Sequence, residues 1–172
     1  TAGLMAVGVH RFVDHPLWLM VHVPLLGAAT AAILIWSQHF ADTLLRRPAL
    51  GGRVGLGIRL LGHTVGAALI VVGILAGVPP LAVTGAIGVA AVALAHGVVL
   101  TLQLRHALPA RFAPLVWYYI AASAVFLGGI AAGIVIVLTG EPGTADRLVM
   151  SHLVLNVFGW LGVTVLGTLV LL

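Results

Sequence analysis

Long apolar segments alternate with short breaks along almost the whole chain. Five of them have at least the roughly 20 residues that a helix needs to cross a bilayer: 17–45, 54–76, 81–104, 113–138 and 147–172. The breaks are rich in Gly, Pro and charged residues, which end helices. Backbone groups in lipid must bond within their own segment, so each stretch is predicted to be a helix. The pattern predicts an all-α integral membrane protein, with a tail at 1–16 and a single bundle of five transmembrane helices over 17–172.

Composition narrows the function classes. Of the 172 residues, 62% are hydrophobic and only 7% are charged, whereas soluble domains carry about 25% charged residues. This composition excludes a soluble enzyme, a disordered protein and a nucleic-acid-binding protein, and it makes the lipid bilayer the expected surroundings. The chain has no cysteine, which excludes disulfides and thiolate-bound metal centres.

Arginines set the expected orientation. The second connection carries no charge, whereas six arginines flank the first and third connections: Arg46, Arg47, Arg53, Arg59, Arg105 and Arg111. By the positive-inside rule, both arginine-flanked connections are expected in the cytoplasm. The N-terminus is then outside and the C-terminus inside, in a multi-pass protein of the cell membrane.

Histidines are unusually frequent for such an apolar chain. Five of the eight fall within the predicted spans: His22, His39, His63, His96 and His152. Counting about 1.5 Å per residue from the span ends places His63 and His96 at one depth, near the cytoplasmic side. The same count places His22 and His152 at a second depth, near the outer side, and gives His39 no partner. Ionisable residues inside spans are rare, so these two pairs are candidate functional residues.

Two histidine layers, each drawn from two helices, are what a helical bundle needs to hold haem b through pairs of axial imidazoles. We therefore predict one or two haems, with His63 and His96 on an inner one and His22 and His152 on an outer one. Arg59 precedes His63 by one turn and could pair with a haem propionate. The expected function is electron transfer across the membrane, as a subunit or domain that serves a redox enzyme and is not catalytic alone.

The glycines near His63 have two interpretations. Gly62 and Gly66 could let a flat cofactor approach the helix, but this spacing also serves ordinary helix packing in membranes. The pairs Gly73/Gly77 and Gly129/Gly133 show the same spacing with no histidine nearby. If the histidines only form hydrogen bonds between helices, the protein is a non-catalytic structural subunit of a larger membrane complex.

A copper site is a further alternative. The outer histidines stand in a repeated pattern, Met20-Val21-His22 and Met150-Ser151-His152, and thioether and imidazole ligands suit Cu(I). Residues two apart on a helix do not share a face, so only one residue of each pair can reach the same ion. The pattern allows a copper-binding or copper-delivery module that uses the outer layer.

The stretch from His152 to Trp160 carries a family resemblance. Its His152, Asn156, Gly159 and Trp160 match the pattern H-x-H-L-N-x-x-G-W, and Val154 stands at the second histidine. The stretch resembles small bacterial membrane proteins related to the catalytic subunit of haem–copper oxidases.

A wider resemblance covers most of the chain. Residues 22–40, residues 108–114 with Tyr118 and Tyr119, and residues 152–168 together resemble the membrane domain that precedes the copper domains of some bacterial multicopper oxidases and copper nitrite reductases. The resemblance implies haem or copper association in a bacterial plasma membrane. It also implies other subunits, or a fused or associated redox domain, at the outer face. Quinol is a further candidate partner of the protein.

Overall fold

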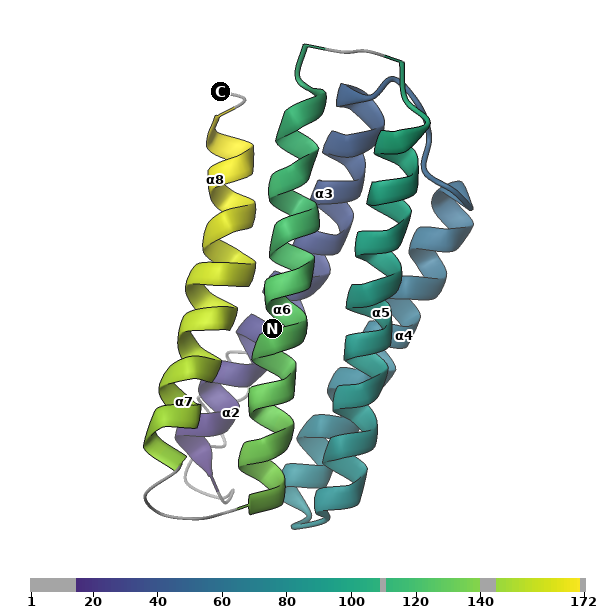
Figure 1. Ribbon diagram of the computed structural model, residues 1–172. Coiled ribbons are helices and arrows are strands. Elements are labelled where there is room, and N and C mark those ends of the chain that lie inside the picture. The colour runs from purple at the N-terminus through teal and green to yellow at the C-terminus, as the bar shows by residue number, and fades with distance from the viewer. Residues whose placement is uncertain (1–14, 109–110, 140–144, 171–172) are drawn as a thin grey trace.

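The computed structural model describes residues 15–108, 111–139 and 145–170, and these residues form helices and no strands. Within this part of the chain, five helical segments are long and apolar enough to cross a membrane: Pro16–Leu44, Gly52–Leu75, Pro79–Arg105, Ala113–Thr139 and Asp146–Leu169. They stand side by side in a bundle (Figure 1). The all-α fold and the five spans are confirmed, and the predicted boundaries agree to within two residues where both ends are described.

The predicted tail lies almost wholly outside the described residues, which begin with His15. At the other terminus, the last two residues of the predicted fifth span are likewise outside them. The two ends of the bundle differ in charge, because the connections after the first and third spans carry arginines. We call the end that carries these connections the arginine end, and it is uppermost in Figure 1. We call the other end of the bundle the opposite end. That the arginine end faces the cytoplasm remains a prediction.

The first and fifth spans each contain a π-helical segment, which the sequence analysis did not predict. The first consists of α2 (Pro16–His22), η2 (Val23–Ala29) and α3 (Thr30–Leu44). Pro24, at the start of η2, has no N–H to donate to the carbonyl one turn earlier, so the regular α-helical pattern is interrupted there.

The fifth span repeats this arrangement with α7 (Ala145–Leu153), η4 (Val154–Gly162) and α8 (Val163–Leu169). No proline accompanies η4. Both π-helical segments begin within two residues of a histidine, His22 in the first span and His152 in the fifth.

The three middle spans are α4 (Gly52–Leu75), α5 (Pro79–Arg105) and α6 (Val116–Thr139), which follows the single turn η3 (Ala113–Leu115). Helices α4 and α5 approach most closely at glycines. A Cβ atom on Gly66 would lie 2.9 Å from the carbonyl oxygen of Gly85 and 2.9 Å from a methyl group of Val89. Small residues at such positions let the two backbones come into contact in the membrane.

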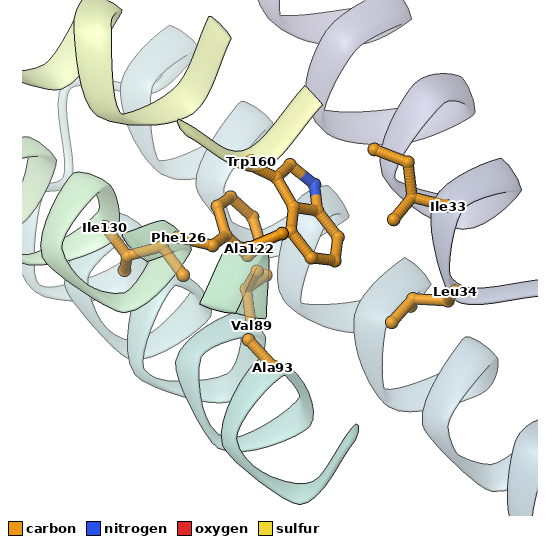
Figure 2. Packing of buried hydrophobic residues seen from close by; sticks show 8 residues of the cluster. All are labelled: Ile33, Leu34, Val89, Ala93, Ala122, Phe126, Ile130 and Trp160. Atoms are coloured by element: carbon orange, nitrogen blue, oxygen red, sulfur yellow. The ribbon is translucent and has the colours of Figure 1, made fainter. Parts of the chain in front are cut away.

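Trp160 of η4 joins the fifth span to the rest of the bundle. Its ring stacks on Phe126 of α6, with centroids 4.6 Å apart and planes 9° apart, and its Nε1 donates to Thr30 Oγ1 at 3.3 Å. Ile33 and Leu34 of α3 approach the other side of this cluster (Figure 2). The cluster therefore ties α3, α6 and η4 together at the centre of the protein.

Close contact at Gly66 yields a first prediction. Gly66→Ala should separate α4 from α5 and lower the free energy of unfolding by about 1–3 kcal/mol, as overpacking does. Gly57→Ala on the same helix is the control, because a Cβ there would meet nothing within 4 Å; it should be neutral or stabilise by up to about 1 kcal/mol. Thermal unfolding in detergent, followed by circular dichroism, measures both. Equal effects of the two substitutions would contradict the packing described.

Candidate functional site

The structure brings together His22 and His152, which the sequence placed at one depth. Their ring centroids are 6.0 Å apart, and the ring planes are only 22° from parallel. His22 is the last residue of α2 and His152 lies in α7. Both helices begin at the opposite end of the bundle (Figure 1). The two side chains therefore come from different spans and lie close together in the half of the protein nearer the opposite end.

Each of these rings is held by a main-chain carbonyl. His22 Nδ1 donates to the carbonyl oxygen of Trp18 at 2.9 Å, and His152 Nδ1 donates to that of Gly129 at 2.8 Å. A carbonyl only accepts, so both hydrogens sit on Nδ1 and the neutral rings keep a lone pair on Nε2. Metal-binding histidines are typically oriented by such a bond from the nitrogen that does not bind the metal.

Neighbouring groups fix the positions of both rings. The indole of Trp18 stacks on His22 with centroids 4.2 Å apart. On α6, a Cβ at Gly133 would lie 2.9 Å from Cε1 of His152. A larger residue at this position would therefore displace the imidazole ring. The sequence analysis treated Gly129 and Gly133 as packing residues with no histidine nearby. That interpretation was wrong, because the histidine comes from the fifth span.

A cavity of about 490 Å³ adjoins the two histidines, and residues of all five spans line it. Most of the side chains that line it are aliphatic or aromatic, including Phe126 and Trp160. Thr30 and Asn156 contribute polar groups to the lining. An apolar cavity with a few convergent polar groups is typical of a ligand or cofactor site. The geometry therefore offers two imidazoles to a largely apolar ligand.

The methionines of the copper alternative do not join this site. Met20 is 36% exposed and Met150 is 60% exposed, and neither lines the cavity. Each precedes its histidine by two residues, which directs it to another face of the helix. Across residues 15–108, 111–139 and 145–170, no cluster of three or more His, Cys, Asp or Glu side chains has metal-binding geometry.

The second predicted pair, His63 and His96, is fully buried but arranged differently from the expectation. Helices α4 and α5 are antiparallel, and a Cβ on Gly62 would lie 3.1 Å from the side chain of Val92. Counting from this contact places Arg59 level with His96. His63 then lies about one helical turn farther from the arginine end. The count along the sequence had placed both histidines at the same depth.

Hydrogen bonds fix the tautomer of His96. Ser37 Oγ donates its one hydrogen to the carbonyl oxygen of Ile33 at 2.5 Å. His96 Nε2 lies 2.8 Å from the same hydroxyl and must therefore be the donor. This leaves Nδ1 as the free lone pair of His96. Gly62 and Gly66 pack against α5, as small residues do in ordinary helix packing. That His63 and His96 hold an inner haem stays a prediction.

Arg59 belongs to a polar cluster that extends toward the arginine end. Its Nη2 donates to Gln38 Oε1 at 2.8 Å. Gln38 Nε2 in turn donates to Asp42 Oδ1 at 2.8 Å, and Gln103 Nε2 donates to the same oxygen at 2.7 Å. The sequence analysis overlooked Gln38, Gln103 and Ser37, although polar side chains inside apolar spans were the available signal. The Arg59 guanidinium is already bound within the protein, which weakens its assignment to a propionate.

The chain matches no protein-family model, no curated protein and no solved structure in the comparisons made. The resemblance to the membrane domains of copper enzymes therefore stays a prediction.

Contact between Gly133 and His152 yields a second prediction. Gly133→Ala should displace the imidazole and lengthen its bond to the Gly129 carbonyl, which changes the ¹⁵N shifts of His152 in histidine-labelled protein. Gly128→Ala is the matched control on the same helix, because the nearest atom to its new methyl group would be 3.5 Å away, in Leu155. Similar shifts of His152 in both variants would show that Gly133 does not position the ring.

Proposed function

We propose that the protein is a membrane electron-transfer module that binds haem b in the cavity beside His22 and His152, and that these two histidines would hold its iron. One observation carries the proposal: two imidazoles from different spans stand 6.0 Å apart, each with Nδ1 bonded to a carbonyl and Nε2 left to bind a metal. When bound, the haem would supply reversible one-electron exchange at its iron.

The nearness of the two rings to each other and to the cavity supports this assignment. Their centroids are 6.0 Å apart, so both imidazoles would be within reach of one cofactor. The adjoining cavity of about 490 Å³ is lined mainly by apolar side chains, which suits the macrocycle and excludes water from the site. The protein would thus contribute ligand orientation and a site of low dielectric constant.

Location indicates where electrons would enter or leave. The site lies in the half of the bundle nearer the opposite end, where α2 and α7 begin (Figure 1). By the expected topology this is the outer side of the membrane, so a redox partner or fused redox domain would exchange electrons there. We propose one haem for each chain at this site, and a second haem at His63 and His96 stays a prediction from the sequence.

Spectroscopy of the purified full chain tests this proposal. The reduced-minus-oxidised spectrum should show the α-band of a b-type haem at one haem per chain. His22→Ala and His152→Ala should each remove nearly all of this band, because each deletes one of the two imidazoles that would hold the iron. His39→Ala is the control, since this histidine is exposed and lies farther along the first span; it should retain the full band.

Two results would overturn the assignment. One is a correctly folded wild-type protein, expressed with sufficient haem, that contains no iron. The other is an unchanged band in both ligand variants. Bound copper without iron, lost in the same two variants, would instead support a copper ion between these imidazoles.

A further inference from the structure

Two connections meet at the arginine end of the bundle and bring arginines together. Arg47, in the first connection, donates from Nη1 to the carbonyl oxygen of His106 at 2.8 Å. The carbonyl oxygen of Arg47 in turn accepts a hydrogen bond from Gln103 Nε2. Arg46 is the chain neighbour of Arg47, and Arg105 is the chain neighbour of His106. These bonds therefore hold Arg46, Arg47 and Arg105 in one small region, and all three are exposed.

Acidic side chains do not neutralise this group of arginines. Within the part of the chain that the structure describes, the acidic residues are Asp42 and Asp146. Asp146 lies in the first turn of α7, at the opposite end of the bundle (Figure 1). Oδ1 of Asp42 already accepts three hydrogen bonds, from Gln38, Gln103 and the main-chain N–H of Ala49. Like charges repel one another, so the exposed arginines favour the binding of an anion.

Arg46 ends the first span in a conformation that glycine normally adopts. Its φ is 49°, which lies in the left-handed region. Its N–H donates to the carbonyl oxygen of Thr43, and the N–H of Arg47 donates to that of Asp42, which is the Schellman motif that ends many helices. Glycine is favoured at this position because it has no Cβ. Strain of the backbone at an arginine indicates that its side chain has a use outside the helix.

Exposed leucines beside these arginines indicate where the anion lies. Leu50 of the first connection is 70% exposed, and Leu108 of the third connection is 83% exposed. Large apolar side chains are costly to expose to water, but they are stabilised where a segment lies against acyl chains. A phosphate ion in solution would use the arginines alone. Phosphate groups at a membrane surface have acyl chains beside them, so they suit both kinds of side chain.

We propose that Arg46, Arg47 and Arg105 bind the phosphate group of an anionic phospholipid. Leu50 and Leu108 would contact the acyl chains beside it. Guanidinium groups match phosphate oxygens through paired, charge-assisted hydrogen bonds. The site would hold both connections at the membrane surface and relieve the repulsion between the arginines. It depends neither on which side of the membrane the arginine end occupies nor on the proposed haem.

Lipid binding to the purified full chain tests this proposal. Native mass spectrometry in detergent should show phosphatidylglycerol bound more tightly than phosphatidylcholine with the same acyl chains. Arg46→Gly and Arg105→Gln should each weaken phosphatidylglycerol binding by roughly five-fold, as expected for the loss of one arginine at a membrane surface. Arg46→Gly should also leave the unfolding temperature unchanged or raise it, because glycine suits the left-handed position. Arg147→Gln is the control, because this exposed arginine lies at the opposite end, and it should bind as the wild type does.

A second pair of variants distinguishes a lipid from free phosphate. Leu50→Ser and Leu108→Ser should weaken phosphatidylglycerol binding and leave binding of inorganic phosphate unchanged. Equal binding of the two lipids by the wild type would overturn the site, and so would unchanged phosphatidylglycerol binding in both arginine variants. Inorganic phosphate bound through the same arginines, with both leucine variants still binding phosphatidylglycerol as the wild type does, would overturn the assignment to a lipid.

Discussion

Alignment of the first and fifth spans is the constraint on which the candidate site depends. Trp160 stacks on Phe126 and donates to Thr30, so the fifth span is anchored to both α6 and α3. Thr30 follows His22 by the same number of residues as Trp160 follows His152. One register between these parallel helices therefore produces both contacts, the hydrogen bond at the centre and the histidine pair nearer the opposite end.

Polar groups in lipid must be satisfied by other protein groups or by a ligand, and the two histidine layers meet this requirement differently. In the outer layer, main-chain carbonyls take the hydrogens of both rings and a cavity adjoins the remaining nitrogens. In the inner layer, Ser37 accepts the hydrogen of His96, and Arg59 donates to Gln38 within a polar cluster. The first arrangement leaves two imidazoles beside a cavity, whereas the second uses its polar groups within the protein.

Sequence reasoning located the spans because lipid demands long apolar helices, a requirement that is visible in the residue pattern alone. It also paired His22 with His152, since both helices start from the same side and their residues can be counted in the same direction. Counting residues from the predicted span ends did not place His63 and His96 correctly relative to each other. Their helices are antiparallel, so an error in the predicted start of α4 adds to an error in the predicted end of α5. The role of Gly133 was not predictable, because its contact with His152 depends on which helices are neighbours.

The π-helical segments separate the length of the first and fifth spans from the direction in which their histidines point. A π-helical turn accommodates one residue more than an α-helical turn. Loss of one residue between Val23 and Ala29 would therefore leave nearly the same turns as regular α-helix, and His22 and Trp18 would keep their direction. Loss of one residue from the α-helix between Thr30 and Ile33 would instead rotate His22 and Trp18 together by about 100° away from the cavity. A deletion inside a π-helical segment is thus expected to be tolerated better than a deletion beside it.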